Sequence, residues 1–193
     1  MIRRPQAPAI CRRWREVVNL RFWARQERRP SVSPNDVFHY APWIRLPDIA
    51  ESGCLMPSNA GGAPDEPPLL WFSSNPVWEP TANKAIMVNG ARHEMTFEQQ
   101  QQTIGCIRFR LPASDSRLMA WEAACSFAGI SPRERQALEI AGQQRGASHE
   151  HWFAVAGPVP LHEVQLEVRL DQWHRGDPAE MARAWSEVWD KRL

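Results

Sequence analysis

Residues 164–170 alternate strictly between apolar and polar side chains, which is the pattern of a strand with one buried face. Residues 104–111 show the same alternation. The segments 37–41, 69–73 and 151–155 are short apolar runs, and they also favour strands. A few short helix signals lie between these strands. This order predicts an α+β fold, because regular repeats of strand, helix and strand would need a longer helix between successive strands.

The expected helices are marked by the residues at their ends. Gly53 suits the left-handed position that closes a helix. Ser131 is a good N-cap and is followed by proline, so it begins a helix. Gly142 is expected to end that helix. After residue 36, the predicted helices are 47–53, 115–129, 131–141 and a last helix from 177 onward.

The first residues of the chain differ in charge from the rest. Nine arginines and only two acidic residues fall within the first 29 positions. Residues 9–26 have the apolar spacing of an amphipathic helix, and residues 29–36 break it. We therefore expect a basic arm over 1–35, helical in part, and a single α+β domain over 36–193. The arm either binds nucleic-acid phosphates or packs on its own domain.

Several classes of protein are disfavoured by composition. No apolar run approaches the roughly 18 residues of a membrane span, and no secretory signal is visible at the N-terminus, so we expect a cytoplasmic protein without membrane contact. The four cysteines form no CxxC pair. His149 and His151 have the spacing of two metal ligands, but no third ligand is evident, so no metal is expected. Nucleophile elbows and phosphate-binding glycine loops are absent from the sequence.

Polar residues occur at the ends of the predicted strands. His39 and Tyr40 end the run 37–40, and Ser73 with Ser74 ends the run 69–74. Glu150 stands just before the strand predicted at 151–155. Such side chains can hold a flat, polar ligand against a sheet, or they can satisfy backbone groups and fill the core. Both interpretations stay open from these residues alone.

The string from Val37 to Tyr40, with the helix and Gly53 after it, resembles the opening of the ADP-ribosyltransferase-like superfamily. It is most similar to the DNA-modifying toxins of the DarT type and to the KptA-like RNA 2′-phosphotransferases. The segment 70–73 resembles the second, aromatic-then-serine strand of that family. Glu150 and the segment 152–164 resemble its catalytic-glutamate strand and the turn that follows. The resemblance spans residues 37 to about 170, and it implies split antiparallel sheets with short flanking helices.

The resemblance also implies a chemistry. NAD would be the substrate, and ADP-ribose would pass to a macromolecular acceptor, a nucleic acid if the basic arm takes part. Glu150 would be catalytic and would stabilise the oxocarbenium-like ribose through its 2′-hydroxyl. The residues implied to bind NAD are His39, Tyr40, Trp71, Phe72 and Ser73. The candidates on the acceptor side are Glu79, Lys84 and Arg108, with Glu79 as a second choice for the catalytic carboxylate.

Two other functions stay open. His151 and Trp152 follow Glu150 where the family has aliphatic residues, so the chain can also be a catalytically inactive binding or inhibitor module on the same fold. An RNA 2′-phosphotransferase would instead need several basic residues that converge on the NAD site. The candidates for that role are Arg45, Arg92, Arg108 and Arg110.

Overall fold

The computed structural model describes residues 35–58 and 66–190, with the backbone alone for 185–190. The predicted basic arm, apart from Asn35, lies outside the described residues, and so do its expected nucleic-acid contacts. The strands are β1 (Asp36–Pro42), β2 (Cys54–Leu55), β3 (Leu70–Ser73), β4 (Ala85–Val88), β5 (Ala91–Glu94), β6 (Cys106–Pro112), β7 (Met119–Ala120), β8 (Trp152–Val155), β9 (Val159–Pro160), β10 (Gln165–Arg169) and β11 (Trp173–Arg175). The α-helices are α2 (Leu46–Ser52), α3 (Phe97–Thr103), α4 (Trp121–Ala128), α5 (Pro132–Gln144) and α6 (Pro178–Asp190), and the 3-10 turns are η2 (Trp43–Arg45), η3 (Pro80–Ala82), η4 (His149–His151) and η5 (Leu161–Glu163).

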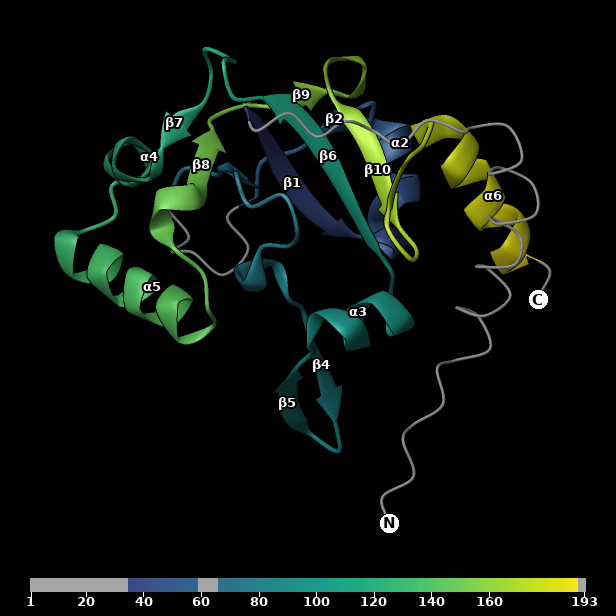
Figure 1. The fold of residues 1–193 in the computed structure, drawn as a ribbon, viewed down its shortest axis with the longest axis horizontal. Helices are drawn as coiled ribbons and strands as arrows, with labels where there is room; N and C mark the ends of the chain where they lie inside the picture. The colour runs from purple at the N-terminus through teal and green to yellow at the C-terminus, as the bar shows by residue number, and fades with distance from the viewer. Residues whose placement is uncertain (1–34, 59–65, 191–193) are drawn as a thin grey trace.

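One antiparallel sheet organises the fold, in the order β11-β10-β6-β1-β3-β8-β7. The helices α4 and α5 lie beside its β7–β8 end, and α2 and α6 lie beside its β10 end (Figure 1). The pairs β2–β9 and β4–β5 form two small sheets of their own. The predicted α+β class with antiparallel strands is therefore confirmed. No helix within the described residues is both long enough and apolar enough to cross a membrane.

Side chains leave β1 alternately on two faces of the sheet. We call the face of Val37, His39 and Ala41 the first face, and the face of Phe38 and Tyr40 the second face. The alternation predicted for 104–111 and 164–170 holds, since Ile107 and Phe109 of β6 and Leu166 and Val168 of β10 are buried on the first face. The core on that face consists mainly of Val37, Ala41, Trp43, Leu46, Leu55, Leu70, Phe72, Ile107, Phe109, Leu111, Val155, Leu166, Val168 and Met181.

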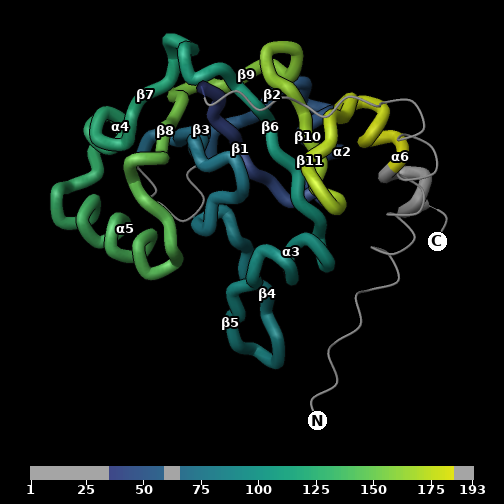
Figure 2. The backbone as a smooth tube through the Cα atoms, in the orientation of Figure 1, coloured from purple at the N-terminus to yellow at the C-terminus, as the bar shows by residue number. Residues whose placement is uncertain are grey.

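The sheet is weakly joined between β1 and β3. β1 pairs with β6 over its whole length, from Asp36↔Pro112 to Pro42↔Cys106. With β3 it shares the single pair Phe38↔Ser73. Figure 2 shows β3 between β1 and β8. The sheet can thus be described as two half-sheets, β11-β10-β6-β1 and β3-β8-β7, whose backbone ladder has one pair at their junction, while their side chains pack in one core.

Helix ends agree with the sequence at some positions and differ at others. α2 is closed by Gly53 at a φ of 68°, as predicted. α5 begins after Ser131 with the expected capping box, but it continues through Gly142 to Gln144. The prediction that Gly142 ends the helix is therefore wrong. A Cβ at this position would lie 2.4 Å from the Trp152 ring, so the glycine makes room for an indole.

The segment 115–129 is only partly helical. α4 starts at Trp121, because Met119 and Ala120 instead pair with Ala154 and Phe153 of β8. Several elements have no counterpart among the sequence predictions, including the strand β11, and two of them lie together. One is α3, and the other is the β4–β5 hairpin, which extends away from the body of the molecule next to α3 (Figure 1).

Candidate functional site

His39 and Tyr40 leave β1 on opposite faces, so they do not line one surface. The His39 ring lies on the first face, 5.9 Å from the ring of Phe72 and 6.4 Å from that of Phe109. Its Nδ1 is 2.8 Å from the carbonyl oxygen of Trp71. A carbonyl only accepts, so Nδ1 carries the proton and Nε2 of the neutral ring is an acceptor. The side chain is half-buried, and burial lowers the pKa of His39 to about 4, against the opposing effect of the Trp71 hydrogen bond.

This depressed pKa makes the stability of the fold depend on pH. In the unfolded chain His39 has its ordinary pKa of 6.5, whereas in the folded chain its pKa is about 4. The neutral His39 ring therefore contributes to the free energy of unfolding above pH 6.5, and this contribution is lost as the pH falls towards 4. Between pH 6.5 and 4, we expect the free energy of unfolding of wild type to fall by about 2 kcal/mol more than that of His39→Asn. The asparagine amide can donate to the Trp71 carbonyl oxygen but does not titrate. Urea unfolding at a series of pH values measures this difference, and parallel profiles would contradict it.

Tyr40 lies on the second face, where its hydroxyl donates to the carbonyl oxygen of Asn75 at 2.5 Å. Its ring packs edge-on against Trp78 at 4.8 Å. Burial raises the pKa of Tyr40 to about 12, so the hydroxyl stays protonated. The segment after β3 is thereby held across the second face of β1.

Ser73 and Glu79 are both buried on this second face. The Ser73 hydroxyl donates to Glu79 Oε2 at 2.7 Å. Glu79 Oε1 accepts from the Thr81 hydroxyl at 2.8 Å and from the Thr81 backbone N–H at 3.2 Å, so the carboxylate caps η3. The structure brings these two predicted residues together, and it gives Glu79 a structural role.

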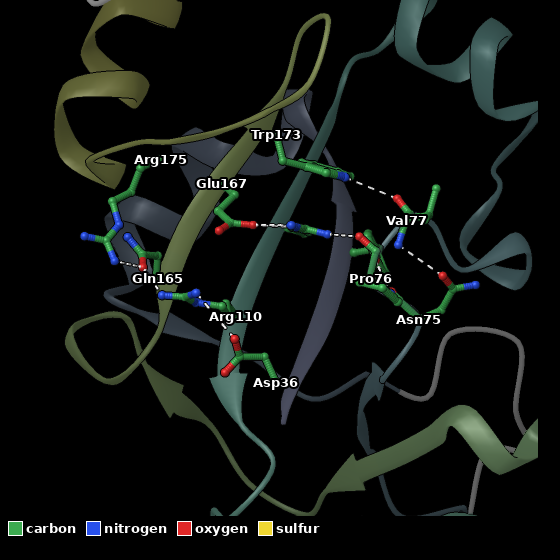
Figure 3. Close-up of polar contacts among 11 residues, drawn as sticks. Asp36, Asn75, Pro76, Val77, Arg110, Gln165, Glu167, Trp173 and Arg175 are labelled. Atoms are coloured by element: carbon green, nitrogen blue, oxygen red, sulfur yellow. Dashed lines mark hydrogen bonds and ion pairs between the residues drawn. The ribbon is translucent and has the colours of Figure 1, made fainter. Parts of the chain in front are cut away.

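Arg108 is fully buried in an ion pair. It stands between Tyr40 of β1 and Glu167 of β10 in the register of the sheet. Its Nε donates to Glu167 Oε2 at 2.6 Å, and neither side chain is exposed. Its Nη1 donates to the carbonyl oxygen of Pro76, seen opposite Glu167 in Figure 3.

Two aromatic rings enclose the same guanidinium. Its carbon lies 4.1 Å from the ring centre of Phe38 and 4.3 Å from that of Trp173. Contacts of this kind stabilise a cation that has been taken out of water. Arg108, expected on the acceptor side, is therefore a structural residue out of reach of an acceptor.

The remaining predicted ligands of NAD are divided between the faces. Trp71 pairs with Ala154 and lies on the second face, with its ring 5.6 Å from that of Trp121. Phe72 is buried in the core of the first face. Lys84 is exposed at the start of the β4–β5 hairpin, where its backbone N–H donates to the Gln100 side chain at 2.7 Å.

Glu150 lies in the 3-10 turn η4, just before β8, with its side chain exposed to solvent. Its neighbour His151 lies against the end of β3. The backbone N–H of Ser74 donates to the His151 carbonyl oxygen at 2.9 Å. The Ser74 hydroxyl lies 2.8 Å from His151 Nδ1. No local sequence signal predicts this Ser74–His151 pair, because 77 positions separate the two residues.

The three strands of the resemblance are neighbours in the sheet, although they lie far apart in the sequence. Ser73 of β3 pairs with Phe38 on one side, next to His39. On the other side it pairs with Trp152, two positions after Glu150. We use the name β1–β3–β8 site for His39, Ser73, Ser74, Glu150 and His151. Adjacent strands bring these residues close in the sheet, but His39 lies on the first face and the buried Ser73 on the second, so their side chains do not line one surface. The accessible groups where β3 ends and β8 begins are the Ser74 hydroxyl, the Glu150 carboxylate and the His151 ring.

No group of three or more His, Cys, Asp or Glu side chains in the described parts of the chain could hold a metal ion. Comparisons of the chain with protein-family models, with curated proteins and with solved structures find no match. The chemistry of the β1–β3–β8 site is therefore argued from the residues and their geometry.

Proposed function

We propose that the protein is an NAD-dependent ADP-ribosyltransferase that acts at the β1–β3–β8 site. The observation that carries this proposal is the order of the strands. The His, Ser and Glu segments quoted for the resemblance occupy adjacent strands, with Ser73 paired to Phe38 on one side and to Trp152 on the other. The short helix α2, which follows β1 and ends at Gly53, is a second observation in support of the proposal.

Glu150 is the catalytic carboxylate of this proposal, in preference to Glu79. Glu79 is buried, and both of its oxygens already accept hydrogen bonds from Ser73 and Thr81. Glu150 is exposed, so its carboxylate can approach a bound ribose. A negative charge placed there stabilises the positive charge that develops as the bond to nicotinamide breaks.

The reaction follows from these roles. The bond between the ribose C1′ and the nicotinamide nitrogen breaks, and the nicotinamide leaves with the electron pair. A nucleophilic atom of the acceptor bonds to C1′ and gives up its proton. His39 offers its Nε2 lone pair to a hydroxyl of NAD, because its Nδ1 proton is fixed on the Trp71 carbonyl. A nucleic acid remains the acceptor class that the arginine-rich first 29 residues favour.

The 2′-phosphotransferase alternative is less well supported. It needs basic side chains that converge on the NAD site, but Arg108 is buried in its ion pair with Glu167. Arg110 is also engaged, with Asp36 at 3.4 Å and with the Gln165 side chain at 2.5 Å (Figure 3). Both arginines stabilise pairing between strands, so neither is available to hold a phosphate.

Nicotinamide release from NAD tests the proposed function. We expect Glu150→Gln to reduce the rate of release about a hundredfold, the order of effect seen when a group that stabilises transition-state charge is removed. Glu51→Gln is the matched control, since Glu51 is also exposed and lies in α2. The control should keep the wild-type rate.

Other outcomes of this experiment contradict the proposal in different ways. Wild-type protein that neither binds NAD nor releases nicotinamide would overturn it. A normal rate in Glu150→Gln would remove Glu150 from catalysis. Wild-type protein that leaves NAD intact but captures a macromolecular partner, with Glu150→Gln harmless, would establish the inactive binding module instead.

A further inference from the structure

Ser74 and His151 form a hydrogen-bonded pair of side chains at an accessible position. The hydroxyl oxygen and Nδ1 are 2.8 Å apart. Ser74 is half-buried, and His151 is exposed. The backbone bond from the Ser74 N–H to the His151 carbonyl oxygen, at 2.9 Å, fixes the two residues relative to each other. A hydroxyl in contact with an imidazole is the arrangement that activates serine as a nucleophile, because the ring can take its proton.

The pair lies beside the carboxylate assigned to catalysis. Glu150 directly precedes His151, and consecutive Cα atoms are about 3.8 Å apart. The turn η4 holds both residues, and the Ser148 side chain accepts from the Glu150 N–H at its start. Ser74 and Glu150 thus lie at the same edge of the sheet, where β3 ends and η4 leads into β8.

We propose that Ser74 is itself an acceptor of ADP-ribose, so that the protein modifies its own chain. This inference rests on the proposed function. The Ser74 oxygen bonds to C1′ of the ribose, and nicotinamide leaves with the electrons of the broken C1′–N bond. The proton of the hydroxyl passes to Nδ1 of His151, which therefore carries its other proton on Nε2 before the reaction. The product is an O-glycosidic bond, and no oxidant or reductant is needed.

The neighbouring serine is not equivalent. Ser73 is buried, and its hydroxyl donates to the carboxylate of Glu79 at 2.7 Å. Its oxygen also accepts from the backbone N–H of Asn75 at 3.1 Å. These contacts hold Ser73 within the fold, whereas the contact of Ser74 is with a group that can accept a proton in the reaction.

ADP-ribosylation of Ser74 would lower the activity of the site that catalyses this modification. The ADP-ribosyl group would stand at the end of β3, beside Glu150 and His151. Its two phosphates would bring negative charge next to the Glu150 carboxylate, which disfavours the approach of a second NAD. The modified chain is therefore a self-limited form of the enzyme.

The test incubates the full chain with NAD and no added acceptor, and then measures intact mass, peptide masses and nicotinamide release. We expect a mass gain of one ADP-ribose on the peptide that contains Ser74. Ser74→Ala should lose this gain, and His151→Ala should slow its appearance at least tenfold. Ser126→Ala is the control, because this exposed serine only donates to the Glu122 carbonyl oxygen and should be modified like wild type.

The outcomes separate this inference from the proposed function. Nicotinamide release without modification of Ser74 overturns the inference alone, and no release from wild type overturns both. Neutral hydroxylamine distinguishes Ser74 from Glu150 as the modified residue, since it cleaves an ester of a carboxylate but leaves a serine O-glycosidic bond intact. A gain that hydroxylamine removes would place the modification on a carboxylate and would also overturn the inference.

Discussion

Arg108→Met is expected to destabilise the fold by about 3–5 kcal/mol, because it leaves a charged group buried without its partner. The Glu167 carboxylate is fully buried and is bound by the Arg108 guanidinium at 2.5–2.6 Å. Methionine fills part of the volume between Phe38 and Trp173, but it supplies neither charge nor donors. The loss should appear as a lower urea midpoint with an unchanged dependence on denaturant.

The double variant Arg108→Met, Glu167→Leu separates the burial of an unpaired charge from a general loss of packing. An apolar pair in place of a buried ion pair is often neutral or stabilising. We therefore expect the double variant to recover most of the loss, so that the two substitutions are strongly coupled. A single variant within about 1 kcal/mol of wild type, or two losses that simply add, would contradict the structural role given to this pair.

Gly105→Ala is expected to lower the free energy of unfolding by about 3 kcal/mol, since two separate penalties act at this position. Gly105 follows α3 with a φ of 70°, a conformation that an L side chain adopts at a cost of about 1 kcal/mol. The added Cβ would also lie 2.8 Å from the Cβ of Trp43, an atom next to the backbone that cannot swing away. Overpacking of this kind adds about 1–3 kcal/mol.

Gly129→Ala is the matched control for this variant. Gly129 has a φ of 72°, but no atom lies within 4 Å of the position that a Cβ would take. Gly129→Ala should therefore lower the free energy of unfolding only by the penalty for a positive φ, about 1 kcal/mol. Thermal or urea unfolding of both variants checks the difference. Equal losses would show that the contact with Trp43 carries no penalty.

The sequence predicts elements well where the signal is local. The alternation at 164–170 and the N-cap at Ser131 depend only on neighbouring residues, and the structure agrees with both. Two further local signals mark elements that lie outside the predicted set. Asn89 and Gly90 between two short runs are a strong hairpin signal, and both have positive φ in the β4–β5 turn. Thr96 with Gln99 three positions later forms the capping box that starts α3.

The placement of the site residues depends on contacts that the sequence does not contain. The alternation along a strand already separates His39 from Tyr40, so their opposite faces could have been predicted. The burial of Arg108 could not, because its partner Glu167 lies 59 positions away. Gly142 likewise looks like the end of a helix until the Trp152 indole is placed against it.

The single Phe38↔Ser73 pair between the half-sheets has a consequence for how the molecule opens. Native proteins loosen in cooperative units whose limits fall where few contacts cross. The half-sheet of β1, β6 and β10 shares long ladders, whereas β3, β8 and β7 are tied to it by one rung of that ladder. Side chains hold the two halves together beyond that rung, because His39 donates to the Trp71 carbonyl oxygen and Tyr40 to that of Asn75, and both halves contribute to one core. Opening of the sheet between β1 and β3 would therefore break side-chain contacts rather than a backbone ladder.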